Sequence, residues 1–95
     1  MSGRARRAAS EVATAIHEVE HARRIARLIE QTLLPALEAR VAQRTRLVAA
    51  GEQLVFVQLH AERDRLTGLE AQARARGAVA WAEVALWSLL GELAR

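Results

Sequence analysis

Two histidines four residues apart are the side chains in this sequence with the clearest capacity for chemistry. His17 and His21 share one face of any helix that contains both, and two imidazoles on one face can contribute to a zinc site. Glu18 with His21 also matches the Glu-x-x-His half of a di-iron bundle site. No later glutamate has a histidine at that spacing. We therefore expect an exposed, idle histidine pair and predict no metal site, with zinc binding as the open alternative.

Catalytic sets of other kinds are scarce. The sequence contains no cysteine, tyrosine or lysine and no glycine-rich phosphate loop. Ser2, Ser10 and Ser88 have no histidine and carboxylate placed to converge on them. The lack of cysteine excludes disulfides and thiolate metal sites. We expect a protein that is not an enzyme and that needs no cofactor.

The basic residues are arginines without exception, 14 in number, yet the net charge is only +3. Much of that excess comes from Arg4, Arg6 and Arg7, and beyond Ala8 the two signs of charge alternate. No aromatic side chain lies near the arginines of the first helix beyond Ala8 to stack on a base, and these are Arg23, Arg24, Arg27, Arg40, Arg44 and Arg46. This pattern is typical of a solvated helix surface and argues against a nucleic-acid partner.

The composition favours helix throughout, with 21 alanines, one proline and many leucine, arginine and glutamate residues. We predict an all-α fold, a long antiparallel two-helix coiled-coil hairpin that assembles into a larger helical bundle. Residues 1–95 form one domain, with a helix over about 5–49, a turn at about 50–53 and a helix over about 54–94. No window is long and apolar enough for a transmembrane helix, and we expect no secretory signal, because Met1-Ser2-Gly3-Arg4 is followed by polar and charged residues.

The first helix carries apolar residues at alternating steps of four and three, the 3.5-residue repeat of a coiled coil. This predicted seam is interrupted at Arg40 and Gln43 before Leu47 and Ala50 resume it. Its earlier members are Ala8, Val12, Ala15, Val19, Ala22, Ala26, Ile29, Leu33 and Ala36.

The second helix offers two apolar stripes. The stripe predicted to face the first helix has an interruption at Glu62 and one extra residue between Leu69 and Gly77. It consists of Val55, Leu59, Leu66, Leu69, Ala73, Gly77, Ala80, Val84, Trp87, Gly91 and Ala94. The opposite stripe is predicted to face another chain in an oligomer, and it begins at Ala75 and continues through Val79, Ala82, Leu86, Leu89 and Leu93. Trp81 and Trp87 are interpreted as packing residues or interface anchors.

Two local breaks occur in the helical pattern. Gly51 follows a helical run where a left-handed cap residue is favoured. Pro35 lies inside the first helix and removes one backbone hydrogen bond. We expect a kink at Pro35, with the apolar seam continuing across it in register.

The stretch around the turn resembles the tip of TolC-like outer-membrane efflux channels. Residues 48–66, VAAGEQLVFVQLHAERDRL, match the family's pattern at Gly51, Val55, Phe56, Leu59 and Ala61. Leu33-Leu34-Pro35 resembles the family's "LLP" segment, about sixteen residues before the glycine, and the alanine-rich end with Trp87, Leu90 and Leu93 resembles its final helix. The resemblance covers roughly residues 10–95.

The resemblance implies a passive conduit. Trimers of that family form an outer-membrane barrel continued by a periplasmic helical tunnel, and glycine-containing tips contact the coiled-coil hairpin of a periplasmic adaptor. The matching partner-contact tip here consists of Ala50, Gly51, Glu52, Gln53 and Leu54.

The family's members run to several hundred residues with barrel strands, whereas this chain shows one hairpin and no strand pattern. We therefore expect a C-terminal fragment, a truncated frame or a stand-alone relative, located at the outer membrane or periplasm. The alternative function is a generic interaction module that forms a homodimeric four-helix bundle. A metal-binding or nucleic-acid-binding bundle is a third reading.

Overall fold

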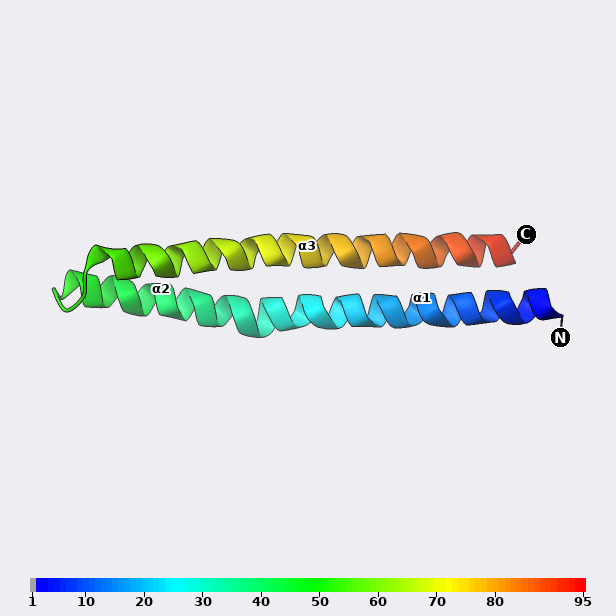
Figure 1. Cartoon of the computed structure of the whole chain (residues 1–95), viewed down its shortest axis with the longest axis horizontal. Coiled ribbons are helices and arrows are strands. Elements are labelled where there is room, and N and C mark those ends of the chain that lie inside the picture. The colour runs from blue at the N-terminus through cyan, green and yellow to red at the C-terminus, as the bar shows by residue number, and fades with distance from the viewer. Residues whose placement is uncertain (1) are drawn as a thin grey trace. The chain divides into compact units, whose positions relative to one another are not determined.

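The computed structural model describes residues 2–95, and every regular element in that range is helical (Figure 1). The order is α1 (Gly3–Leu28), a π-helix η1 (Ile29–Leu33), α2 (Leu34–Ala49) and α3 (Val55–Leu93). The predicted order of helix, turn and helix is confirmed, and each outer boundary lies within two residues of its expected place. No strand occurs in the part of the chain that the structure describes.

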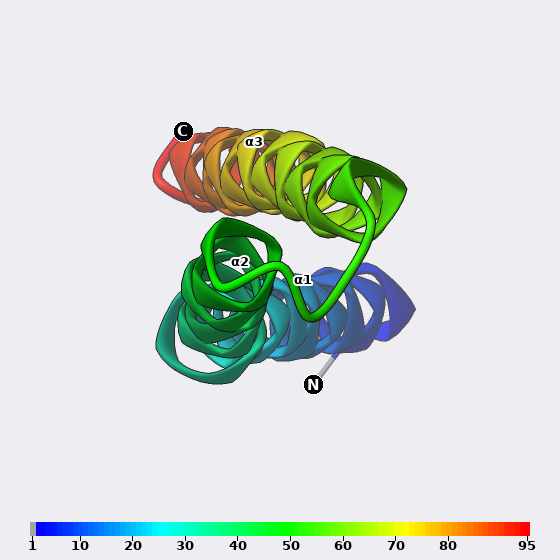
Figure 2. The same cartoon turned by 90° about the vertical axis from the view of Figure 1, so that its left-hand side faces the viewer.

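Backbone contacts divide the chain into two units. Unit 1 joins Met1–Ala26 to Ala75–Arg95, so the start of α1 lies beside the end of α3 and runs antiparallel to it (Figure 1). Unit 2, Arg27–Arg74, contains η1, α2, the turn and the start of α3. Figure 2 looks onto the turn that joins α2 to α3. Each unit is an antiparallel helix pair.

The face of α1 predicted to pack against a second helix is buried as expected. Ala15 and Val19 are 5% exposed, and Ala75 on the inner face of α3 is 7% exposed. The other predicted members up to Ile29 are half-buried, namely Ala8, Val12, Ala22, Ala26 and Ile29 itself. These small side chains let the two backbones of unit 1 approach closely.

One cross-helix ion pair accompanies this packing in unit 1. Arg23 Nη2 donates to Glu83 Oε1 at 2.9 Å, with both side chains more than a third exposed. A pair so open to solvent contributes about 0–1 kcal/mol. The apolar packing therefore determines the pairing of the helices, and the ion pair adds little.

At η1 the buried face moves by one residue. The Leu34 N–H donates to the Ile29 carbonyl, five residues back, because Pro35 has no N–H and its ring disfavours the narrower turn. After this wide turn the buried position is Leu34, at 6% exposure, while Leu33 is 41% exposed. Leu37, Val41 and Arg44 continue the inner face.

The expected continuation of the seam in register across Pro35 is therefore wrong. Ala36, Arg40 and Gln43 are exposed, so the polar interruption lies on the outside of the helix and not in its seam. A π turn accommodates one extra residue, and that residue accounts for the shift.

The face of α3 that packs inward also differs from the expectation. Its inner positions recur every seven residues, and a half-buried position lies three residues before each of them. The first set is Ala61, Gly68, Ala75, Ala82 and Leu89, and the second is Gln58, Arg65, Gln72, Val79 and Leu86. This repeat is a strict heptad, so the predicted extra residue between Leu69 and Gly77 is wrong.

Close approach in unit 2 centres on Gly68. A Cβ at this position would lie 2.6 Å from Leu37 Cδ1 and 3.1 Å from Leu34 Cδ2. Both distances are shorter than carbon–carbon contact allows. Glycine therefore permits Leu34 and Leu37 of α2 to rest against the backbone of α3.

The end of α2 is closed by a Schellman motif. Gly51 has φ of +73°, its N–H donates to the Val48 carbonyl at 3.0 Å, and the Glu52 N–H donates to Leu47 at 2.9 Å. Both bonds satisfy carbonyls that the helix leaves free. The predicted left-handed cap at Gly51 is confirmed.

Replacement of Gly51 by alanine should lower the free energy of unfolding by about 1–2 kcal/mol, because Cβ disfavours positive φ. Gly51→Asn should lose less, since asparagine tolerates this region better. Urea unfolding followed by circular dichroism measures both. Gly3→Ala, at an open helical position, is the control and should be near neutral. Equal stability of Gly51→Ala and the parent would contradict the motif.

Gly68→Leu should lower the free energy of unfolding by about 1–3 kcal/mol, because the added side chain overlaps Leu37 and Leu34. Combining it with Leu37→Ala makes room on the facing helix and should recover part of the loss. The same urea titration measures the single and double variants. Additive losses in the double variant would show that the two residues do not contact each other.

Candidate functional site

Apolar side chains that the chain leaves exposed dominate its surface. In the described range, residues 2–95, only five hydrophobic side chains are buried, and three of them belong to alanines. Among residues 2–95, by contrast, fourteen large hydrophobic residues are 37–78% exposed. Contiguous exposed apolar surface commonly marks a place where another protein binds. The candidate sites are therefore docking surfaces, and two stand out on α3.

The first is the tip surface, defined as Leu54, Val55, Phe56 and Leu59 next to the turn in unit 2. Their exposed fractions are 75%, 53%, 67% and 52%. Phe56 and Leu59 also line a shallow hollow with His60 and Arg63. The Schellman motif fixes the chain direction just before these residues, so they project from a defined turn.

The partner-contact tip predicted from the resemblance lies directly beside this surface. Ala50, Gly51, Glu52 and Leu54 are exposed. Gln53 is half-buried, and its Oε1 accepts a hydrogen bond from Arg44 Nη1 at 3.5 Å. This bond ties the turn back to α2. The backbone turn is thus held from both sides while the side chain of Leu54 stays free.

The second surface is the tryptophan face of α3 in unit 1. Trp81, Val84 and Trp87 are 78%, 60% and 70% exposed. Small exposed residues surround them, and Gly77, Ala80, Ser88 and Gly91 complete the face. A Cβ at Gly77 or Gly91 would meet no atom within 4 Å.

The two apolar stripes of α3 have the reverse of their expected roles: the one expected to face outward packs inward, and the one expected to pack inward is exposed. The stripe expected to face an oligomer partner lies toward α1, where Val79, Ala82, Leu86 and Leu89 are half-buried. Leu93 alone remains 52% exposed. The stripe expected to pack within the hairpin is largely exposed, with only Leu69 half-buried. The inner stripe carries Ala75 and Ala82 among its larger residues, and these alanines permit closer helix contact than Val84 and Trp87 would.

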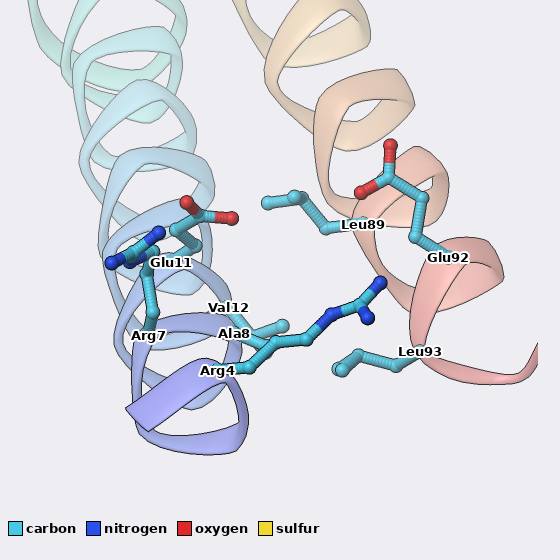
Figure 3. Close-up of a pocket in the computed structure, with 8 residues that line it drawn as sticks. All are labelled: Arg4, Arg7, Ala8, Glu11, Val12, Leu89, Glu92 and Leu93. Atoms are coloured by element: carbon cyan, nitrogen blue, oxygen red, sulfur yellow. The ribbon is translucent and has the colours of Figure 1, made fainter. Parts of the chain in front are cut away.

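A hollow lined by residues of α1 and α3 lies at one end of unit 1 (Figure 3). Its volume is about 260 Å³, below the range of about 300–1,000 Å³ usual for ligand sites. Figure 3 shows Arg4 reaching across from α1 toward Leu93 of α3. The lining mixes both signs of charge and holds no histidine, serine or cysteine, consisting of Arg4, Arg7, Ala8, Glu11, Val12, Leu89, Glu92 and Leu93.

The histidine pair lies on the exposed side of α1. His17 Nδ1 is 3.8 Å from Glu20 Oε2, and the side chain of His17 is 83% exposed. Within residues 2–95 no three histidine, aspartate or glutamate side chains gather closely enough to hold a metal ion. In the same range no helix combines the length and apolar character needed to cross a membrane.

Truncation at the tip surface should leave the chain's own stability intact. Phe56→Ser should change the free energy of unfolding by less than about 0.5 kcal/mol, because the ring is 67% exposed. Leu34→Ala, at a 6% exposed position, should cost about 2–5 kcal/mol and serves as the contrast. Denaturant titrations of both variants make the comparison. A large loss in Phe56→Ser would mean that the ring supports the fold and is not free to dock.

No family model, curated protein or solved structure matches the chain. The TolC-like family therefore remains a hypothesis that rests on the residues of the turn and on Leu33, Leu34 and Pro35. The function must be argued from the two surfaces themselves.

Proposed function

We propose that this protein is a non-catalytic helical assembly element that docks onto a helical partner through its turn end. The observation that carries the proposal is the tip surface: four large apolar side chains, all more than half exposed, directly after a hydrogen-bonded turn. A rigid turn that presents unburied apolar groups supplies binding energy at little cost in ordering.

The spacing of these side chains suits a helical partner. Val55 and Leu59 are four residues apart on α3, and Phe56 and Leu59 are three apart, so they form one patch. Helix-in-groove recognition uses anchors at these intervals. Full burial of each large apolar side chain contributes about 1.5–3 kcal/mol. Three such anchors contribute about 4.5–9 kcal/mol before the cost of association, so a stable contact also requires the partner to bury the residues around them.

The resemblance to TolC-like channels supplies the finer form of this proposal. In that form the chain is a segment of a periplasmic tunnel wall in an efflux system, and the partner at the tip is the coiled-coil hairpin of a periplasmic adaptor. Support comes from the position of Gly51 at the turn and from the tip residues Ala50, Glu52 and Leu54, which are exposed beside it.

Photo-cross-linking in cells that make the protein tests this proposal. A photoreactive residue at Phe56 should form a covalent product with a protein that carries a long coiled-coil hairpin, identified by mass spectrometry. The matched control is the same residue at Leu28, which is 57% exposed on α1 and lies outside the tip surface. Leu28 should not form that product.

Two outcomes would contradict the docking proposal. One is equal capture of the same protein from Leu28 and Phe56, because the contact would then not be specific to the tip. The other is a product at Phe56 that contains only a second copy of this chain, which would favour self-association.

A second candidate function is a homodimeric helical bundle. The observation that favours it is the tryptophan face, where Trp81 and Trp87 are the most and third most exposed of the large hydrophobic residues. Tryptophan is enriched among the residues that dominate binding energy at interfaces. Sedimentation of the full chain distinguishes a dimer from a trimeric tunnel assembly or a monomer.

A further inference from the structure

We propose that two copies of the chain associate through the tryptophan face, with their α3 helices antiparallel and a two-fold axis beside Val84. This inference deepens the second candidate function, on which it rests, and it is independent of docking at the tip surface.

The tryptophan face has nearly the same residues in both directions from Val84. Steps of three, four and seven residues on either side meet side chains of like size, which are Trp81 and Trp87, Ala80 and Ser88, and Gly77 and Gly91. A two-fold interface needs a surface that is complementary to itself, because each contact from i to j is repeated from j to i. An antiparallel pair centred on Val84 meets that requirement, whereas an unrelated partner would not need the mirrored order.

Helix geometry then places each tryptophan over small residues of the second copy. At 3.6 residues per turn, Trp81 and Trp87 lie about 60° to either side of Val84, so the rings pass each other without collision. Trp81 packs over Ser88 and Gly91 of the second copy. Trp87 packs in the same way over Ala80 and Gly77, and the space above both glycines is open.

Charges at the rim fit the same arrangement. Arg74 and Glu92 are exposed and lie on one flank of α3, each about 80° from Val84. Antiparallel pairing brings Arg74 of one copy beside Glu92 of the other, offset by about 3 Å along the helix axis. No charged side chain belongs to the tryptophan face itself. An apolar centre with opposite charges at its edge is the usual composition of a specific interface.

Cysteine cross-linking tests the register, because the natural chain has no cysteine. Gly77→Cys and Gly91→Cys both place a thiol in open space. The proposed pairing sets residue 77 of one copy opposite residue 91 of the other. A mixture of the two variants should therefore form a disulfide-linked dimer under mild oxidation, whereas either variant alone should remain largely unlinked. Val84→Cys should link to itself at the axis, with Val55→Cys as the matched control that does not.

Sedimentation of the full chain supplies the second measurement. Trp87→Ala should weaken dimerisation at least about tenfold, because an interface tryptophan contributes strongly to binding. Phe56→Ala, at a ring of similar exposure on the same helix, should leave the dimer unchanged. Dilution of the parent should also shift the fluorescence of the chain, since both of its tryptophans belong to this face.

The possible outcomes distinguish failure of the proposed tryptophan-face pairing from failure of the homodimer on which it rests. The antiparallel register would be overturned if Gly77→Cys by itself formed the disulfide-linked dimer as readily as its mixture with Gly91→Cys. A stable dimer that neither the mixture nor Val84→Cys can link would overturn the inference and leave a homodimeric bundle in place. A monomer at every concentration would overturn both.

Discussion

Close contact between helices through alanine and glycine is the constraint on which the structure depends. The inner face of α3 offers Ala61, Gly68, Ala75 and Ala82 at seven-residue intervals. Side chains of this size bring backbones together but remove little apolar area from water. Larger apolar side chains share this face mainly toward the C-terminal end of α3, at Val79, Leu86 and Leu89. Most of the other bulky residues of α3 lie on the remaining faces, where they stay exposed.

A chain built in this way gains modest stability from its own core. Within residues 2–95 no side chain is fully buried, and the ion pairs of Arg23 with Glu83 and of Arg40 with Asp64, which join helices, are exposed to solvent. Such a protein gains most when a partner covers the remaining apolar surface, because ligand binding to the folded state adds to its stability. Folding and association are then closely linked. In the proposed assemblies a partner would supply much of the buried area.

Local preferences made part of this fold predictable from sequence. Helical composition gave the elements, and Gly51 marked the turn because few residues tolerate positive φ. The inner face of α3 was not predictable from hydrophobicity, since half-buried Gln58, Arg65 and Gln72 occupy its repeat beside small residues. The bulky Leu59, Leu66 and Trp87 suggested the wrong face. Of the predicted tip residues Gln53 is half-buried and the other four are exposed. Val55, Leu59, Val84 and Trp87 were expected inside the hairpin because their size suggested burial, yet all four are exposed.

The π-helix at Ile29–Leu33 also bears on which insertions and deletions the chain can tolerate during evolution. One wide turn accommodates a residue that a continuous α-helix would not, so the inner faces before and after it follow different seven-residue frames. An insertion or deletion of one residue within this π-helix confines the resulting strain to a single turn. The inner faces of α1 and α2 then keep their contacts. Relatives of this protein can therefore differ in length at this point while keeping the same contacts, and an alignment made on one uninterrupted heptad would misplace half of the first helix.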